Sequence, residues 1–326
     1  MAEKMRPILF SCINKHAVDQ ALIWLQSLKM SYVEFPQNKD FQVELWCTVD
    51  VETDIISKLF PDVNLRLVKS VAVVETGLAP VDYLEGMVLR LQALDVYHYQ
   101  FPDGVQLVYM DTDLVVNGDI TPLNRAPFGN DQWLAACSDY PNMGEKPFDS
   151  AYSELVGDWE RRMAINVNYF NSGVMVIRTA GLYKELAKWG FTSTVDFFDR
   201  YKDMCYLPDQ DALNKLAQNY LVMPRTYNVF PEYHIHSVLP IDMLIEHRRK
   251  AMSAAVIHFL GMAKPWRKAR MTNRITVQLP YEVYWKYMKP ITQHLDPAIV
   301  EGVKHNIDVN RIIIEQVYQK HLAEIV

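Results

Sequence analysis

Short apolar runs alternate with helical patterns along the first 110 residues. The run Ile8–Ile13 is apolar almost throughout, which is typical of a strand buried on both faces of a parallel sheet. In residues 17–28, apolar positions recur three and four apart, so this stretch predicts a helix. The same criteria predict strands at 41–49, 64–68 and 105–110, a helix at 83–96, and a helix at 53–59 capped by Thr53.

The second part of the chain continues this pattern and ends in helices. Strands are predicted at 133–138, 170–178 and 255–259, a helix at 209–218, and helical structure from residue 281 onward. Strands that alternate with helices predict an α/β fold with a mostly parallel central sheet flanked by helices, and ligands bind such sheets at the carboxyl ends of the strands. No repeat or low-complexity linker is present, so we expect a catalytic domain at 1–270 and a helical C-terminal extension at 271–326.

Composition narrows the class of protein. The chain has 326 residues, of which 50% are hydrophobic, enough for a sizeable core. Its net charge of −6 argues against a nucleic-acid partner. No run approaches the ~18 uncharged apolar residues of a membrane span, and the start lacks a signal-like apolar region. We therefore expect a cytoplasmic protein, in which four cysteines without CxxC spacing are structural.

Two aspartates follow the strand predicted at 105–110. In the stretch VYMDTDLVVNGDI, Asp111 and Asp113 lie two apart, so in an extended chain both carboxylates face one spot while Thr112 points away. Two such anions repel each other unless a cation joins them, and Mg²⁺ or Mn²⁺ prefers oxygen ligands and could carry a diphosphate. The alternative is a solvated turn that binds nothing.

Three further segments carry candidate chemistry. In VIHFLGMAKPW, His258 could bind the metal, Gly261 permits close backbone approach, and Lys264 could neutralise phosphate; a hydrogen-bonded core histidine is the alternative. In YFNSGVMVI, Asn171 and Ser172 could bind a ligand hydroxyl or only form a turn. In LPDQDALN, a helix begins at Asp209 as N-cap, and Gln210 and Asp211 project from its first turn.

Together the motifs MDTD, FNSGV, PDQDALN and HFLGMAKPW resemble, in order, those of the retaining glycosyltransferases of family 8, which include bacterial lipopolysaccharide galactosyltransferases and glycogenin. The resemblance spans residues 8–266 and implies a GT-A type nucleotide-diphospho-sugar transferase fold. It implies a UDP-sugar donor and Mn²⁺, with Mg²⁺ as a second candidate. The implied reaction moves glucose or galactose to an acceptor hydroxyl and forms an α-glycosidic bond.

The resemblance also implies roles for individual residues. Asp111, Asp113 and His258 look like the metal ligands, and Gly261 and Lys264 look like the diphosphate clamp. Residues 10–16, with Ser11 and Asn14, look like the uridine-binding strand and loop, although the family often has an acidic residue and a tyrosine where this chain has Ile13 to His16. The remaining donor contacts are expected at Arg90, Thr112, Asp139, Asn171 and Ser172, and Asp209, Gln210 and Asp211 are expected around the anomeric carbon.

The residue types favour a particular reaction course. A covalent intermediate needs a carboxylate nucleophile within reach of the anomeric carbon, but Gln210 is an amide and a poor nucleophile. We therefore expect the acceptor hydroxyl to attack the same face that the leaving group departs, with retention of configuration.

Several alternatives stay open. A nucleotidyltransferase would also place metal carboxylates at strand ends, but SCINKHAVDQ lacks the glycine-rich loop of that class. A glycogenin-like self-glucosylating protein and a non-catalytic nucleotide-sugar-binding protein are the other candidates. The polar insertion at 140–166 suits an acceptor-binding lid or a surface excursion. The acceptor is a carbohydrate, glycolipid or protein; the basic clusters at 246–250 and 266–274 would suit peripheral membrane contact, and a homo-oligomer is also open.

Overall fold

The computed structural model divides the chain into two compact units. Unit 1 comprises residues 1–18, 37–112 and 121–225, and unit 2 comprises residues 19–36, 113–120 and 226–326. The structure describes residues 6–69, 81–139, 162, 164–202, 205, 207–230, 248–260, 264–267 and 280–325. The domain boundary expected near residue 270 falls outside these ranges and stays a prediction.

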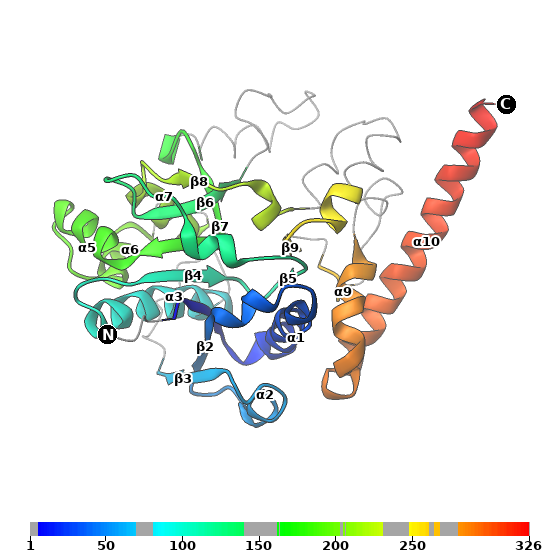
Figure 1. Cartoon of the computed structure of the whole chain (residues 1–326), viewed down its shortest axis with the longest axis horizontal. Helices are drawn as coiled ribbons and strands as arrows, with labels where there is room; N and C mark the ends of the chain where they lie inside the picture. The colour runs from blue at the N-terminus through cyan, green and yellow to red at the C-terminus, as the bar shows by residue number, and fades with distance from the viewer. Residues whose placement is uncertain are drawn as a thin grey trace. The chain divides into compact units, whose positions relative to one another are not determined.

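Unit 1 is built on a seven-stranded sheet with the order β3-β2-β1-β4-β7-β6-β8 (Figure 1). Strands β1, β2, β3 and β4 pair in parallel, as do β6 and β8, whereas β7 runs antiparallel to both β4 and β6. This confirms the predicted α/β fold with a mostly parallel sheet. The strands are β1 (Ile8–Ile13), β2 (Gln42–Thr48), β3 (Asn64–Val68), β4 (Gln106–Met110), β6 (Leu134–Ser138), β7 (Phe170–Arg178) and β8 (Leu221–Val222).

The central strands form because their side chains are buried on both faces. All six residues of β1 are buried, and Phe10 packs edge-to-face on Tyr97 and on Tyr109, each with ring centroids 5.2 Å apart. A bulge between Ala136 and Cys137 shifts the register of β6 against β7. All four cysteines are buried and free, as expected of structural thiols.

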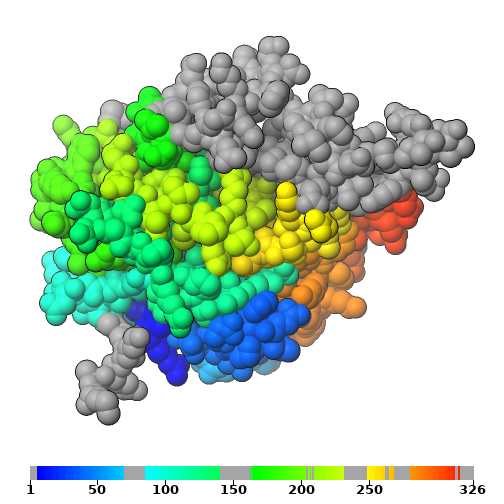
Figure 2. Space-filling view, turned by 45° about the horizontal axis from the view of Figure 1, so that its top comes forward, coloured from blue at the N-terminus to red at the C-terminus, as the bar shows by residue number. Residues whose placement is uncertain are grey.

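Helices connect these strands. Ser193 caps α6, since its hydroxyl accepts hydrogen bonds from Val195 N at 3.1 Å and Asp196 N at 3.3 Å. Thr53 precedes α2 but makes no side-chain cap bond, so the predicted cap is wrong there; its backbone is already helical instead of extended. Helices α5 and α6 form part of the exposed surface, green in Figure 2. The helices of unit 1 are α2 (Asp54–Leu59), α3 (Val81–Gln100), α5 (Thr179–Lys188), α6 (Thr194–Tyr201) and α7 (Pro208–Leu216).

Unit 2 holds a second, two-stranded sheet, and its described residues include three named α-helices. Strand β5 (Leu114–Val116) pairs antiparallel with β9 (Val256–His258), which places Leu114 opposite His258. The Val116 N–H donates to Ser27 Oγ at 2.9 Å, which ties β5 to the helix α1. The helices are α1 (Val18–Glu34), α9 (Tyr281–Met288) and α10 (Pro297–Ile325). Among the helices of the described residues, none combines the length and the apolar character needed to cross a membrane.

The two aspartates lie between strands of different sheets. Strand β4 ends at Met110 and β5 begins at Leu114, so the alternation expected of one continuous strand does not hold at Asp111 and Asp113. Asp111 is still held beside the first sheet, because its N–H donates to Gly173 O at 2.8 Å in unit 1. It then joins β9, where Asp113 O accepts from the Phe259 N–H at 3.0 Å. Their separate backbone anchors, not the pleat of a strand, hold the two residues.

Candidate functional site

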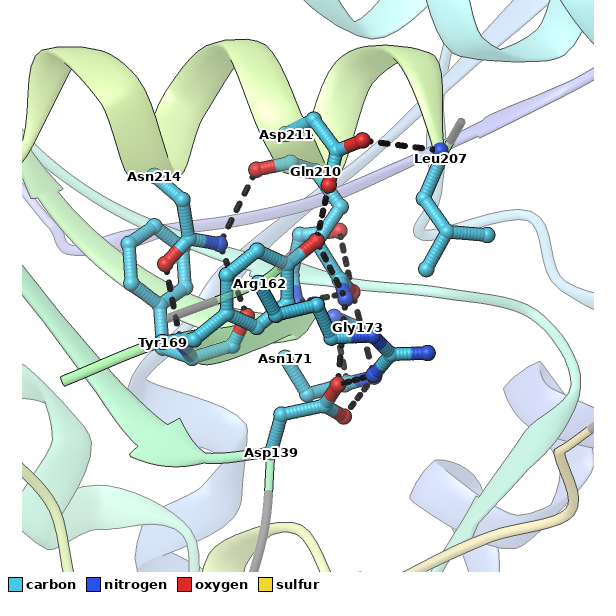
Figure 3. Close-up of polar contacts among 11 residues, drawn as sticks. Asp139, Arg162, Tyr169, Asn171, Gly173, Leu207, Gln210, Asp211 and Asn214 are labelled. Carbon is cyan, nitrogen blue, oxygen red and sulfur yellow. Dashed lines mark hydrogen bonds and ion pairs between the residues drawn. The ribbon is translucent and has the colours of Figure 1, made fainter. Parts of the chain in front are cut away.

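Gln210 lies at the centre of a buried polar network in unit 1. It sits in the first turn of α7, beside the first residues of β7 (Figure 3). Its side-chain oxygen accepts hydrogen bonds from Asn171 Nδ2 at 3.2 Å, Ser172 N at 3.0 Å and Ser172 Oγ at 3.3 Å. The structure therefore brings together three of the residues predicted from two motifs that lie about 35 positions apart in the sequence.

Asp139 joins this network from the end of β6. Because β6 runs antiparallel to β7, the Asp139 N–H donates to Tyr169 O at 3.0 Å, beside the start of β7. The carboxylate is fully buried and forms an ion pair with Arg162. It also accepts hydrogen bonds from Asn171 Nδ2 and Gln210 Nε2, both at 3.4 Å. A buried carboxylate with this many donors is held as an anion.

Arg90 links α3 to the same network. It is almost fully buried and forms an ion pair with Asp209. Its guanidinium also donates to Ser172 O at 2.9 Å and lies 4.5 Å from the centroid of the Tyr109 ring. Its Nη1 atom is 3.7 Å from Asp111 Oδ1. Arg90 thus connects two of the predicted acidic residues, one from the first motif and one from the third.

Asp211, and not Asp209, satisfies the start of α7. The helix begins at Pro208 with Leu207 as N-cap, and Asp211 Oδ2 accepts from the Leu207 N–H at 3.1 Å. The predicted capping role of Asp209 is therefore wrong, because its carboxylate is engaged by Arg90. Burial, with the Asp211 carboxylate beside it, raises the pKa of the Tyr169 hydroxyl far above its usual range. Tyr169 consequently stays neutral, and its hydroxyl donates a hydrogen bond to Asp211.

Asn214 fixes α7 against β7. Its Nδ2 donates to Phe170 O and to Gln210 O, both at 2.9 Å, and its Oδ1 accepts from the Phe170 N–H at 2.9 Å. Sequence reasoning did not select Asn214, Tyr169 or Arg162. The spacing of four residues between Gln210 and Asn214 was an available signal, since residues four apart share one helix face.

A second polar cluster lies in unit 2. Asp113 Oδ1 is 2.9 Å from His258 Nε2, and Asp113 Oδ2 forms an ion pair with Lys264. The other ring nitrogen of His258, Nδ1, is 2.9 Å from Asn228 Oδ1. Pairing of β5 with β9 produces this arrangement, because His258 is the last residue of β9 and Asp113 immediately precedes β5. Three residues predicted from two motifs are thus in contact.

The electrostatics of this cluster favour an ionised carboxylate. Burial alone would raise the pKa of Asp113, but Lys264 and His258 beside it hold that pKa well below its usual range. Because Nδ1 faces an amide oxygen, it carries the ring proton when the imidazole is neutral. A cation bound between Nε2 and the Asp113 carboxylate would require this neutral form of the ring.

The remaining predicted residues are distributed along the same chain segments. Ser11 is fully buried in β1, and Asn14 follows this strand, where its side chain accepts from the His16 N–H at 3.0 Å. Thr112 is the last residue of its segment of unit 1, between the two aspartates. Gly261 lies outside the described residues, as does most of the 140–166 insertion. The roles of these residues in binding the donor stay predictions.

Comparison with known proteins identifies relatives of this chain. The model of the family described as "Glycosyl transferase family 8" matches residues 89–270. The lipopolysaccharide 1,2-glucosyltransferase of Escherichia coli (strain K12) is 33% identical over 171 residues, which are 50% of this chain and 44% of that protein. The glycosyltransferase GlyE of Streptococcus pneumoniae serotype 4 (strain ATCC BAA-334 / TIGR4) is 25% identical over 197 residues, 58% of this chain and 39% of that protein. The chain thus spans less than half the length of these relatives.

Solved structures support the fold. A galactosyltransferase LgtC bound to donor and acceptor sugar analogues matches with a TM-score of 0.55 and 19% identity, covering 91% of this chain and 99% of that one. The bifunctional glycosyltransferase WbbM matches with a TM-score of 0.59 and 16% identity, covering 93% of this chain and 52% of that one. At these identities the likeness shows a GT-A-like fold.

Proposed function

The chain belongs to glycosyl transferase family 8, and on this premise we propose that it transfers glucose or galactose from a UDP-sugar to an acceptor hydroxyl, with retention of configuration. The observation that carries the proposal is the Asp113, His258 and Lys264 cluster, which lies within the matched residues together with the network around Gln210. The Asp113 cluster suits a divalent cation and the diphosphate of the donor, and the Gln210 network suits the hydroxyl groups of a sugar.

Asp111, Asp113 and His258 are candidate ligands for one divalent cation in this proposal. Two observations in unit 2 support the fit. His258 Nε2 and Asp113 Oδ1 are directed at each other at 2.9 Å, and Asn228 fixes the His258 ring from its other side, as second-shell partners of metal-bound histidines do. Carboxylate oxygens with an imidazole suit Mn²⁺, and Mg²⁺ is the second candidate. When bound, the cation would supply Lewis-acid stabilisation of the diphosphate leaving group.

Lys264 supplies a fixed positive charge beside Asp113. Breaking the sugar–phosphate bond leaves negative charge on the UDP oxygen, and an ammonium group held near it stabilises this charge without transferring a proton. Lys264 would thus act on the leaving group, while the Gln210 network would orient the sugar. Arg90, Asp139, Asn171 and Ser172 are the proposed donor-sugar contacts, and Ser11, Asn14, Thr112 and Gly261 the proposed nucleotide contacts.

The contacts of the carboxylates favour same-face attack over a covalent intermediate. Asp209 is paired with Arg90, and Asp211 accepts from Tyr169 and Leu207, so both carboxylates already have protein partners. Engagement of this kind lowers nucleophilicity, and Gln210 is an amide. The acceptor hydroxyl would then attack directly. Trapping a glycosylated Asp209 or Asp211 with a slow donor, followed by peptide mass spectrometry, would contradict this course.

The acceptor is proposed from the relatives. Because one relative is named a lipopolysaccharide 1,2-glucosyltransferase, we infer a carbohydrate acceptor of a bacterial glycolipid. Self-glucosylation and nucleotide-sugar binding without turnover are the alternatives. The cytoplasmic location, peripheral membrane contact and homo-oligomer considered from the sequence stay predictions.

The proposal is tested by incubating the protein with individual UDP-sugars, with Mn²⁺ or with EDTA, and measuring UDP release. Release that depends on Mn²⁺ and on one UDP-hexose is expected, and NMR of the product should show an α-linkage. Binding of UDP-sugar without release in the presence of glycolipid acceptors would instead support the non-catalytic alternative. Sugar attached to the protein itself would support self-glucosylation.

A further inference from the structure

The helix α10 contacts the segment Lys264–Arg267, which carries the proposed phosphate-neutralising lysine. Asn306 of α10 is fully buried, and its Nδ2 donates to Pro265 O at 2.7 Å and to Arg267 O at 2.9 Å. One amide group therefore holds the backbone on both sides of Trp266. Within the segment, the Arg267 N–H donates to Lys264 O at 3.0 Å, which closes a turn.

Gly302 lets α10 approach the carbonyl of Trp266, which lies between the carbonyls of Pro265 and Arg267 that Asn306 binds. A Cβ atom at position 302 would lie 2.4 Å from Trp266 O and 3.1 Å from Trp266 C, closer than real side-chain atoms come to backbone. Residues 302 and 306 are four apart and so lie on one face of α10. This face contacts three consecutive carbonyl groups, those of residues 265, 266 and 267.

The helix α9 contacts the Lys264–Arg267 segment through an aromatic pair, Tyr284 with Trp266. The Trp266 ring lies 5.6 Å from that of Tyr284, and the Lys264 ammonium lies 5.7 Å from the Trp266 ring centroid. Tyr284 is fully buried and also packs edge-to-face on Phe259, which follows His258. The Lys264 ammonium thus lies beside an aromatic cluster and also pairs with Asp113.

We propose that Asn306 and Gly302 are positioning residues: through the Lys264–Arg267 segment they hold the Lys264 ammonium where it binds the diphosphate of the donor. The inference rests on the proposed function and gives the C-terminal helices a part in donor binding. A lysine on a four-carbon stem is a flexible point charge, so its location depends on the backbone that carries it. Anchoring that backbone by two hydrogen bonds and a close helix approach limits the positions that the charge can take.

The test combines a chemical and a binding measurement on the full chain. In the variants Asn306→Ala and Gly302→Ala, Lys264 should react about tenfold faster with trace acetic anhydride, measured by peptide mass spectrometry against the exposed Lys188, because the pair with Asp113 is loosened. Isothermal titration of UDP in the presence of Mn²⁺ should show affinity about tenfold weaker for both variants. Asn306→Ala removes the tether, whereas Gly302→Ala displaces the segment, so either one suffices if the other does not fold.

Controls separate positioning from general damage. His305→Ala alters the neighbouring, exposed residue of α10 and should leave both measurements at wild-type values. In a Lys264→Ala background, Asn306→Ala should weaken UDP binding by no more than about twofold, because the residue acts through the lysine. Fully additive losses would show a merely structural role and overturn the inference.

Two other outcomes are informative. Wild-type labelling rates and UDP affinities in both variants would overturn the inference, and so would faster labelling without weaker UDP binding. If the wild-type protein binds no UDP with Mn²⁺, the proposed function fails and with it the donor-binding role, whereas the labelling rates still show whether α10 positions Lys264.

Discussion

The two polar clusters satisfy their charges in different ways. In unit 1, each buried aspartate of the Gln210 network has its own protein partners: Arg162 for Asp139 and Arg90 for Asp209. In unit 2, one oxygen of Asp113 pairs with Lys264, and its other oxygen lies 2.9 Å from His258 Nε2. The first cluster is complete as protein, whereas the second gains from an added cation.

This difference separates two tasks. A network whose donors and acceptors are matched internally is rigid before ligand arrives, which suits the recognition of sugar hydroxyls. A cluster of a carboxylate and an imidazole nitrogen suits a metal ion, whose binding depends on pH because the ligands must be deprotonated. We therefore expect changes in the Asp113 cluster to affect metal-dependent activity, and changes in the Gln210 network to affect stability with or without metal.

The largest effect is expected from Asp113→Ala. Loss of one metal carboxylate should remove on the order of 4 kcal/mol of transition-state stabilisation, about 10³-fold in kcat/KM for Mn²⁺-dependent UDP release. The exposed Asp62→Ala variant is the matched control and should keep wild-type kinetics. Near-wild-type activity of Asp113→Ala in Mn²⁺ would rule out the assignment of this cluster to the metal.

The next largest effect is expected from Asp139→Asn. It leaves the Arg162 guanidinium without its anion in a buried site, so the free energy of unfolding in urea should fall by about 3 kcal/mol. The fall should be the same with EDTA and with Mn²⁺, since this network needs no metal.

The exposed pair of Arg311 with Asp308 offers a matched comparison. Both side chains are more than 60% exposed, so Asp308→Asn should change stability by less than about 0.5 kcal/mol. A loss in Asp139→Asn that disappears when Mn²⁺ is added would mean that the two clusters are not independent in the way we infer.

The sheet was predictable because its signal is local. The run Ile8–Ile13 is almost entirely apolar and is buried, and the run Phe170–Arg178 is buried except at Arg178; the ends of both agree with the predicted ones. Helix ends were less predictable: α1 extends to Glu34, six residues beyond its prediction, and the polar residue Ser31 in this extension is buried. The hydroxyl of Ser31 is satisfied by Leu28 O, which sequence does not reveal.

The partners of the site residues were harder to predict than the residues themselves. The family resemblance selected Asp139 and Asp209, but an ion pair between residues 23 or 119 positions apart leaves no periodic trace in one sequence. Asp209 illustrates how this misleads a prediction. An aspartate near a helix start predicts a cap, yet Arg90 from α3 pairs with Asp209, and Asp211 accepts the hydrogen bond from the Leu207 N–H instead. Tertiary charge pairing overrode local propensity there.

Among the variants of the two polar clusters, the smallest effect is expected from a change of one side-chain amide. Asn214→Asp keeps the shape and the acceptor for the Phe170 N–H but removes the donor to Phe170 O and Gln210 O. Because it also places a carboxylate beside two carbonyl oxygens, we expect a loss of about 2 kcal/mol in the free energy of unfolding, measured in urea above pH 6.

Asn64→Asp, at an exposed position of β3, is the control for this exchange and should cost little. If protonation restores the donor, lowering the pH toward 4 should recover part of the difference between Asn214→Asp and the wild type, whereas the Asn64→Asp difference should stay constant. An Asn214→Asp variant as stable as the wild type at pH 7 would mean that Asn214 does not fasten α7 to β7. The orientation of Gln210 would then have to come from its side-chain partners Asn171, Ser172, Asp139 and Tyr169.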